Sequence, residues 1–203
     1  MIFTVSKQIK EEIDRTIKEI WLTDICKDYG NGLLIKEASL QCVFYHHLRS
    51  KLEHLLKENN LYIYPEYYFK DLKYRADLVI AEMDMSIPTY YLWERMTDII
   101  AVIEFKYDGG DTKSTVDYIK TDKSKIREYV SDLPYDCQYY FGVIYETECV
   151  QLNWFDKRST NNWASGRLTE LNAGYLEEEM CFEVHSYNNL NFQYDKVICE
   201  IKF

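Results

Sequence analysis

The segment IIAVIEFKY, residues 99–107, decides the fold predicted for this chain. Its β-branched and aromatic residues are typical of a buried strand. Because side chains alternate across a strand, Glu104 and Lys106 project from the same face, roughly 6–7 Å apart. Two charges at the end of a buried strand are costly to desolvate, so we expect other groups to compensate them.

The preceding predicted strand supplies a second carboxylate. The segment YRADLVI, residues 74–80, places Asp77 directly before an apolar run. If these strands are antiparallel neighbours, Asp77 and Glu104 meet on one face. Two carboxylates held together repel each other, and a bound Mg²⁺ is the usual way to keep both ionised. The two segments therefore predict a metal site.

Working outward, the neighbouring segments predict an α-β-β-β-α-β order. Apolar residues at helical spacing predict one helix over residues 6–29 and, after a break at residues 30–32, a second helix whose apolar positions run from Leu40 to about Lys57. A strand over Leu61–Phe69 follows. A capping box at residues 114–117 opens a further helix, which ends before Pro134. A strand over Gln138–Glu146 follows.

The C-terminal part is predicted to be rich in strands. We interpret Cys149–Phe155 as a strand that forms a hairpin with the strand before it, and Cys181–His185 and Lys196–Phe203 as further strands. Residues 161–179 are too mixed to assign. The chain is thus expected to be one domain with an N-terminal helix (1–31), a core (32–156) and a C-terminal extension (157–203).

Composition restricts the classes of protein that fit. A chain of 203 residues with 47% hydrophobic and 29% charged residues is typical of a folded domain and excludes collagen-like and disordered classes. The net charge of −10 excludes a simple basic protein that coats DNA. With no signal peptide, no apolar run of about 20 residues and scattered cysteines, we expect a cytoplasmic protein without a membrane partner.

Asp77 followed by Glu104-x-Lys106, in this order of elements, resembles the PD-(D/E)xK nuclease superfamily. The resemblance covers about residues 32–146, although Ala76 stands where the motif's name has Pro. It implies a restriction-endonuclease-like α/β fold with a mixed sheet, and a metal-dependent endonuclease. It further implies that Asp77 and Glu104 bind Mg²⁺, for which Mn²⁺ could substitute, and that Lys106 positions or deprotonates the attacking water.

Two neighbouring helices supply further candidate residues. Glu37 and Gln41 extend the core-facing stripe of the helix before the sheet, so Glu37 is expected to join the catalytic residues as a metal or water ligand and Gln41 to be accessory. After the Glu104 strand, the pattern Asp122-x-x-Lys125-Ile126-x-x-Tyr129 resembles one found in nuclease-like families. We include Lys125 as a second accessory candidate.

The helix after the Glu104 strand is also locally basic. Residues 113–127 carry five basic and two acidic side chains, and we expect phosphate contacts from Lys113, Lys120, Lys123 and Arg127. Nucleic acid, DNA rather than RNA, is the expected partner, with a homodimer or a partner protein as a further possibility.

Other interpretations of these residues remain open. Glu104 and Lys106 could form a structural ion pair, and the chain could be an interaction or regulatory module of the nuclease fold that is inactive without a partner. Glu66, which follows Pro65, could replace Asp77 as the first acidic residue. The inserted loop around residues 83–98, rich in Tyr and Trp, could contact a substrate or a partner, or cap the sheet.

Overall fold

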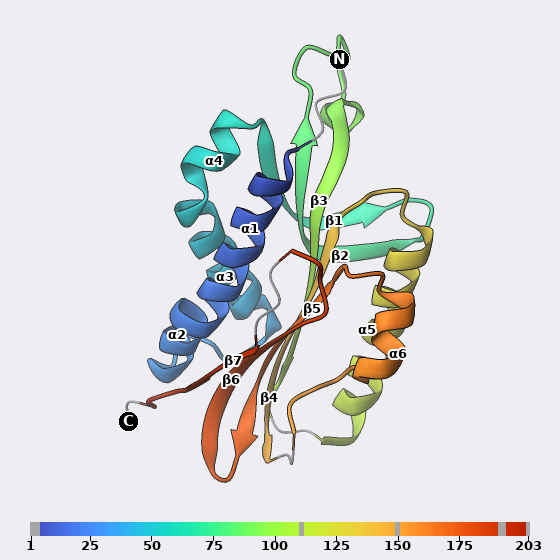
Figure 1. Ribbon diagram of the computed structural model, residues 1–203. Coiled ribbons are helices and arrows are strands. Elements are labelled where there is room, and N and C mark those ends of the chain that lie inside the picture. The colour runs from blue at the N-terminus through green and yellow to red at the C-terminus, as the bar shows by residue number, and fades with distance from the viewer. Residues whose placement is uncertain (1–4, 110–111, 149–150, 191–193, 202–203) are drawn as a thin grey trace.

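Seven strands form one mixed sheet with helices on both faces, so the chain has an α/β fold (Figure 1). The structure is a computed structural model that describes residues 5–109, 112–148, 151–190 and 194–201, without the side chains of residues 112–118, 120, 157 and 194. The strands lie across the sheet in sequence order: β1 (Leu61–Phe69), β2 (Tyr74–Met83), β3 (Met96–Asp108), β4 (Gln138–Glu148), β5 (Leu168–Leu176), β6 (Glu179–Ser186) and β7 (Tyr194–Ile198).

The direction of the strands changes within the sheet. Strands β1, β2 and β3 are antiparallel neighbours, β3, β4 and β5 are parallel, and β6 and β7 continue antiparallel. Parallel neighbours need a crossover connection, and these crossovers contain α5 (Thr112–Asp132) and α6 (Lys157–Trp163). Both helices lie on the same side of the sheet (Figure 1).

The opposite face is covered by the N-terminal helices. Helix α1 (Lys7–Ile20) is capped by Ser6 and continues through a π-helical turn (Trp21–Ile25) into α2 (Cys26–Gly30). Helices α3 (Glu37–Lys51) and α4 (Glu53–Glu58) follow. Their apolar stripes bury Ile13, Ile17, Leu40, Phe44 and Leu48 against the sheet. The two predicted N-terminal helices are confirmed.

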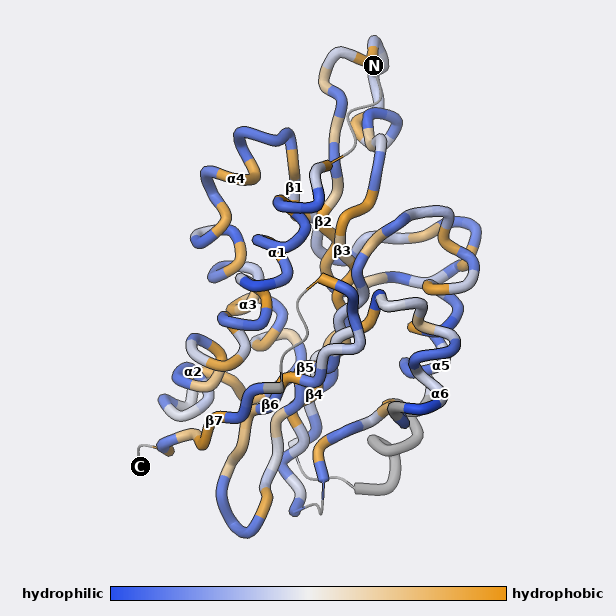
Figure 2. Tube along the Cα trace, viewed as in Figure 1, coloured by the Kyte–Doolittle hydropathy of each residue, from blue (hydrophilic) through white to orange (hydrophobic). Residues whose placement is uncertain are grey.

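Hydrophobic residues follow this layered arrangement. One core lies between the sheet and the N-terminal helices, and a second lies between the sheet and α5 and α6. Figure 2 shows hydrophobic residues along β3, whereas hydrophilic and hydrophobic residues alternate along the helices. Because β3 is covered on both faces, its segment IIAVIEF is buried throughout.

The predicted hairpin after β4 is wrong. Residues 151–156 form no strand, and β4 is instead followed by α6 and the parallel strand β5. The backbone N–H groups of Trp154 and Phe155 donate to the carboxylate of Glu170, at 2.7 and 3.2 Å. The apolar residues of this segment pack on the sheet, which gives the segment the composition of a strand. Its backbone N–H groups, however, bind the Glu170 side chain and not a neighbouring strand. Cys149 lies outside the described residues.

The remaining C-terminal predictions are confirmed in part. Strand β6 matches the predicted strand at residues 181–185, and β7 overlaps the one predicted from Lys196. Residues 161–179, which could not be assigned, contain the end of α6 and all of β5.

The inserted loop predicted before the Glu104 strand connects β2 and β3. It contains a short 3-10 helix, Leu92–Arg95, and exposes Tyr90, Tyr91 and Trp93. Figure 1 shows that it extends beyond one end of the sheet.

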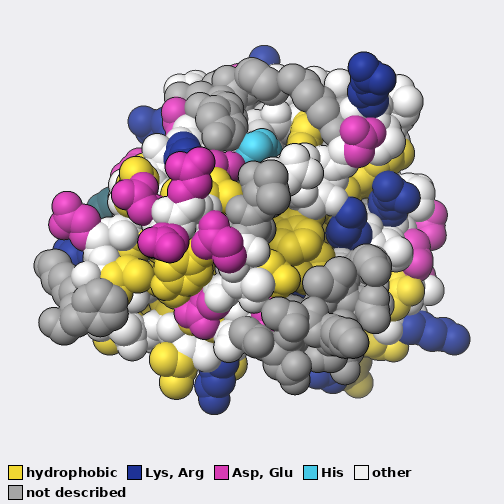
Figure 3. Space-filling view, turned by 90° about the horizontal axis from the view of Figure 1, so that it is seen from below, with side chains coloured by type: hydrophobic (Ala, Val, Ile, Leu, Met, Phe, Trp, Pro, Cys, Tyr) yellow, Lys and Arg dark blue, Asp and Glu magenta, His cyan; other side chains and the backbone are white. Residues whose placement is uncertain are grey.

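Charged side chains are unevenly distributed on the end of the molecule seen in Figure 3. Acidic side chains gather near α2 and the turn between β5 and β6, whereas Lys and Arg are mainly on the side of α5 and α6. Among the helices of the described residues, none is both long and apolar enough to cross a bilayer.

Gly142 on β4 provides a test of the packing behind β3. A Cβ atom at Gly142 would lie 2.6 Å from Cδ1 of Phe105, which separates Glu104 from Lys106. We therefore expect Gly142→Ala to lower the free energy of unfolding by about 1–3 kcal/mol, measured by denaturant titration. Gly109→Ala is the control, since its Cβ would meet only ordinary contacts at 3.5 Å. Equal stability of the two variants would contradict this packing.

Candidate active site

Strands β2 and β3 place Asp77 opposite Glu104. The register pairs Leu78 with Ile103, and one further step along both strands brings Asp77 and Glu104 together. The backbone N–H of Phe105 donates to Oδ2 of Asp77 at 2.6 Å. The antiparallel arrangement expected from the sequence is confirmed. The hydrogen bond from Phe105 holds the Asp77 carboxylate next to the part of β3 that carries Glu104.

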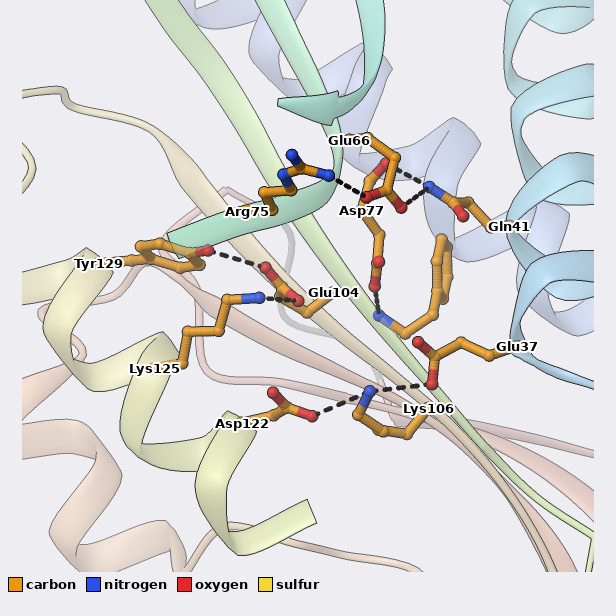
Figure 4. A network of polar contacts seen from close by, with 11 residues as sticks. Glu37, Gln41, Glu66, Arg75, Asp77, Glu104, Lys106, Asp122, Lys125 and Tyr129 are labelled. Carbon is orange, nitrogen blue, oxygen red and sulfur yellow. Dashed lines mark hydrogen bonds and ion pairs between the residues drawn. The ribbon is translucent and has the colours of Figure 1, made fainter. Parts of the chain in front are cut away.

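Helix α5 supplies both hydrogen-bond donors to the Glu104 carboxylate. Lys125 Nζ lies 2.8 Å from Oε2, and the Tyr129 hydroxyl donates to Oε1 at 3.0 Å. Residues four apart on a helix share one face, so Lys125 and Tyr129 reach the same carboxylate (Figure 4). Glu104 is 2% exposed, and these two contacts replace the water that it lacks.

Lys106 lies between two carboxylates from different helices. Its Nζ is 2.9 Å from Oε2 of Glu37, the first residue of α3, and 3.2 Å from Oδ2 of Asp122 on α5. Figure 4 shows Glu37 and Asp122 approaching Lys106 from opposite sides. The ammonium group of Lys106 thus connects the helical layers at the end of β3.

Gln41 positions the backbone of β2. Its side-chain amide donates to the carbonyl oxygen of Asp77 at 2.8 Å and to Oε1 of Glu66 at 3.1 Å. Glu66 also lies 3.9 Å from Arg75, and it is exposed. Glu66 therefore lies at the rim of the site and does not take the place of Asp77.

Burial and mutual repulsion raise the pKa values of the two central carboxyl groups. Burial raises the pKa of Glu104 to about 8; repulsion from Asp77 adds to the shift, and the attraction of Lys125 does not cancel it. Burial likewise raises the pKa of Asp77 to about 6, against the hydrogen bond from Phe105. Both shifts show that the site favours a compensating positive charge.

The pKa of Lys106 is raised, which keeps its ammonium group charged. Burial disfavours its ammonium form, but the contacts with Glu37 and Asp122 together outweigh burial and raise the pKa. Lys106 therefore remains a cation at neutral pH.

Six of the candidate residues belong to one network. The structure brings together Glu37, Gln41, Asp77, Glu104, Lys106 and Lys125. Glu37 contacts Lys106, and among the described residues no group of three or more His, Cys, Asp or Glu side chains is arranged to hold a metal. The role expected for Glu37, as a metal or water ligand, stays a prediction.

Two of the basic candidates of α5, Lys123 and Arg127, lie beside aromatic rings. Lys123 lies 5.2 Å from the ring centroid of Phe155, and Arg127 lies 5.2 Å from that of Trp163. The side chains of Lys113 and Lys120 are outside the described residues. Lys123 and Arg127 therefore lie along the aromatic residues near α6.

Two residues of the network, Asp122 and Tyr129, belong to the pattern quoted from the sequence, which assigned them no role of their own. Asp122 contacts Lys106, and Tyr129 binds Glu104. Their spacing with Lys125, at i, i+3 and i+7, is the signal that places all three on one face of a helix. Which strand that face covers depends on the crossover to β4.

Comparisons with protein-family models, with curated proteins and with solved structures find no match to this chain. The arrangement of Asp77, Glu104 and Lys106 is therefore the observation on which an inference of function depends.

The raised pKa of Glu104 predicts how stability without metal depends on pH. Between the ordinary value of 4.5 and about 8, the folded protein retains a proton that the unfolded chain has lost. The contribution of Glu104 to the free energy of unfolding is thus fully present below about pH 4.5 and is lost as the pH rises through 8. We expect the free energy of unfolding to fall with a slope of up to about 1.4 kcal/mol per pH unit.

Denaturant titrations from pH 5 to pH 9 measure this slope. Glu104→Gln should flatten the curve, because the amide does not titrate. Glu53→Gln, an exposed glutamate on α4, is the matched control and should keep the wild-type slope. A wild-type curve as flat as that of Glu104→Gln would show that Glu104 does not titrate in this range.

Proposed function

We propose that this chain is a metal-dependent nuclease of the PD-(D/E)xK type that hydrolyses phosphodiester bonds in DNA. The observation that carries the proposal is the convergence of Asp77, Glu104 and Lys106 on one face of β2 and β3. The order of elements supports it: α3 and the short α4 are followed by β1, β2, β3, α5 and β4, and the resemblance implies a restriction-endonuclease-like core with an α-β-β-β-α-β order.

The donor atoms at the centre of the site suit Mg²⁺. Carboxylate oxygens are the hard ligands that this ion prefers, and Mg²⁺ is often held by only two carboxylates together with water and substrate phosphate. Asp77 and Glu104 would hold it, with Mn²⁺ as a substitute. When bound, the ion would polarise a phosphoryl oxygen and lower the pKa of a coordinated water.

Lys106 is assigned an electrostatic role. Because its pKa is raised, its ammonium group stays protonated and is a poor base for the attacking water. A fixed positive charge beside the carboxylates can instead stabilise the negative charge that develops on the phosphate. Glu37 and Asp122 hold this charge in position.

Charge on the α5 and α6 side supports a polyanionic substrate. The described basic side chains of α5 and α6 are Lys123, Lys125, Arg127 and Arg158, and the described acidic ones of α5 are Asp122, Glu128 and Asp132. Figure 3 shows Lys and Arg side chains on this side of a protein whose net charge is −10. Phosphate groups beside α5 would lie next to the helix that binds Glu104.

One observation favours a second function, a regulatory or interaction module of the same fold that is inactive alone. Both oxygens of Glu104 already have protein partners, Lys125 and Tyr129. A module that never binds metal would need such neutralising contacts. Cleavage and metal-binding assays separate this function from the nuclease.

For the nuclease, we expect cleavage of plasmid or linear DNA in Mg²⁺ or Mn²⁺. Lys106→Met should reduce the rate at least about 100-fold while metal binding, measured by calorimetry, remains. Asp77→Asn should weaken metal binding itself. Lys51→Met, which changes a lysine on the opposite helical layer, is the control. Intact plasmid, linear DNA, single-stranded DNA and RNA, with no heat of metal binding, would rule out the nuclease.

Substrate contacts of α5 have a separate test in the inactive Lys106→Met background. The double change Lys123→Ala and Arg127→Ala should weaken DNA binding and reduce the slope of log K against log salt by about 1–2, as for two lost phosphate contacts. Arg49→Ala, on α3, is the matched control. An unchanged slope in the double variant, measured by fluorescence anisotropy, would place the DNA elsewhere.

A further inference from the structure

The network around Glu104 contains more carboxylates than ammonium groups. Four carboxylates, from Glu37, Asp77, Glu104 and Asp122, lie around the two ammonium groups of Lys106 and Lys125 (Figure 4). With all six groups ionised the excess is two negative charges, which one divalent cation would balance; without metal, burial and mutual repulsion oppose the ionisation of Glu104 and Asp77. The exposed pair of Glu66 and Arg75 adds no net charge.

The two lysines differ in the carboxylates that they contact. Lys106 forms its ion pairs with Glu37 and Asp122, at 2.9 and 3.2 Å, and its charge also acts to lower the pKa of nearby Asp77. Lys125 contacts Glu104, one member of that pair, at 2.8 Å. Lys125 is therefore the cation of this network that lies where a metal would bind.

A metal ion held by Oε2 of Glu104 would compete with the ammonium group of Lys125, which already binds that oxygen. Mg²⁺ binds carboxylate oxygens at about 2.0–2.1 Å, so an ammonium group remaining at hydrogen-bond distance from that oxygen would be strongly repelled. The flexible four-carbon chain of Lys125 allows its ammonium group to move away without a shift of α5. The Tyr129 hydroxyl donates to the other oxygen, Oε1, and does not have to move.

We propose that Lys125 is a tethered cation that neutralises Glu104 until a divalent metal binds, and that it competes with this metal for the Glu104 carboxylate. The inference rests on the proposed function, since it assumes that Asp77 and Glu104 bind metal. It assigns separate roles to the two lysines: Lys106 acts on the phosphate, and Lys125 sets the affinity for metal.

The test is the metal affinity of the full chain carrying Lys125→Met, measured by calorimetry with Mg²⁺ and with Mn²⁺. Removing the competing charge should tighten metal binding about tenfold. The melting temperature without metal should fall, because buried Glu104 loses its cation, so the rise on adding Mg²⁺ should exceed that of the wild type. Lys51→Met, which removes a lysine charge from α3, where it pairs with Glu19 and Asp24, should change the dissociation constant less than about twofold.

Two conservative variants keep the test decisive if Lys125→Met does not fold. Lys125→Gln keeps a hydrogen-bond donor beside Glu104 and should also bind metal more tightly, whereas Lys125→Arg keeps the charge and should stay near the wild-type affinity. Circular dichroism establishes which variants are folded.

The outcomes separate this inference from the proposed function. If the wild type binds metal and cleaves DNA while folded Lys125→Met or Lys125→Gln binds metal no more tightly, the competition is wrong and the nuclease stands. If neither the wild type nor the variants bind metal, both the inference and the metal-dependent nuclease are overturned.

Discussion

The rest of the site depends on the burial of one carboxylate. Glu104 lies on a strand that helices cover on both faces, and it is 2% exposed. A charge without water needs donors from the protein, and α5 supplies them through Lys125 and Tyr129. The position of α5 is therefore coupled to the chemistry of β3: the helix both buries the carboxylate and satisfies it. Repulsion from Asp77 adds to the cost of this burial, which explains why the pKa values of both carboxyl groups are raised.

The topology of the sheet brings these groups together from distant parts of the chain. An antiparallel connection places Asp77 beside Glu104, because β2 and β3 are paired in that register. A parallel connection then requires a crossover, which carries α5 over the same face. Helix α3 belongs to the other layer, yet its first residue, Glu37, reaches Lys106 where β3 approaches its end. Strand β2, helix α5 and helix α3 thus each contribute one part of the network.

The net charge of −10 has a different meaning once the side chains are located. Part of the excess is concentrated around the site, where four carboxylates surround two lysines. Lys123 and Arg127 lie on α5, the helix that also carries Asp122 and Lys125 of the site. An acidic centre next to a basic surface suits a metal ion and a phosphate better than tight non-specific binding of nucleic acid. The charge therefore supports a substrate that binds together with a cation, within the proposed function.

The sequence by itself determined the strands β1 to β4 and the helices around them, because alternation and helical periodicity are local properties. It predicted that Asp77 meets Glu104 only on the condition that their strands are antiparallel neighbours, which the tertiary structure supplies. It also singled out Glu37, Gln41, Lys106 and Lys125. Only the tertiary structure decided which partners these side chains take: Glu37 binds Lys106, and Lys125 binds Glu104. The mistaken hairpin has the same origin, since Glu170, on a strand that the sequence did not reveal, satisfies the backbone of Trp154 and Phe155. Contacts between distant segments depend on how the layers pack, and no local pattern records them.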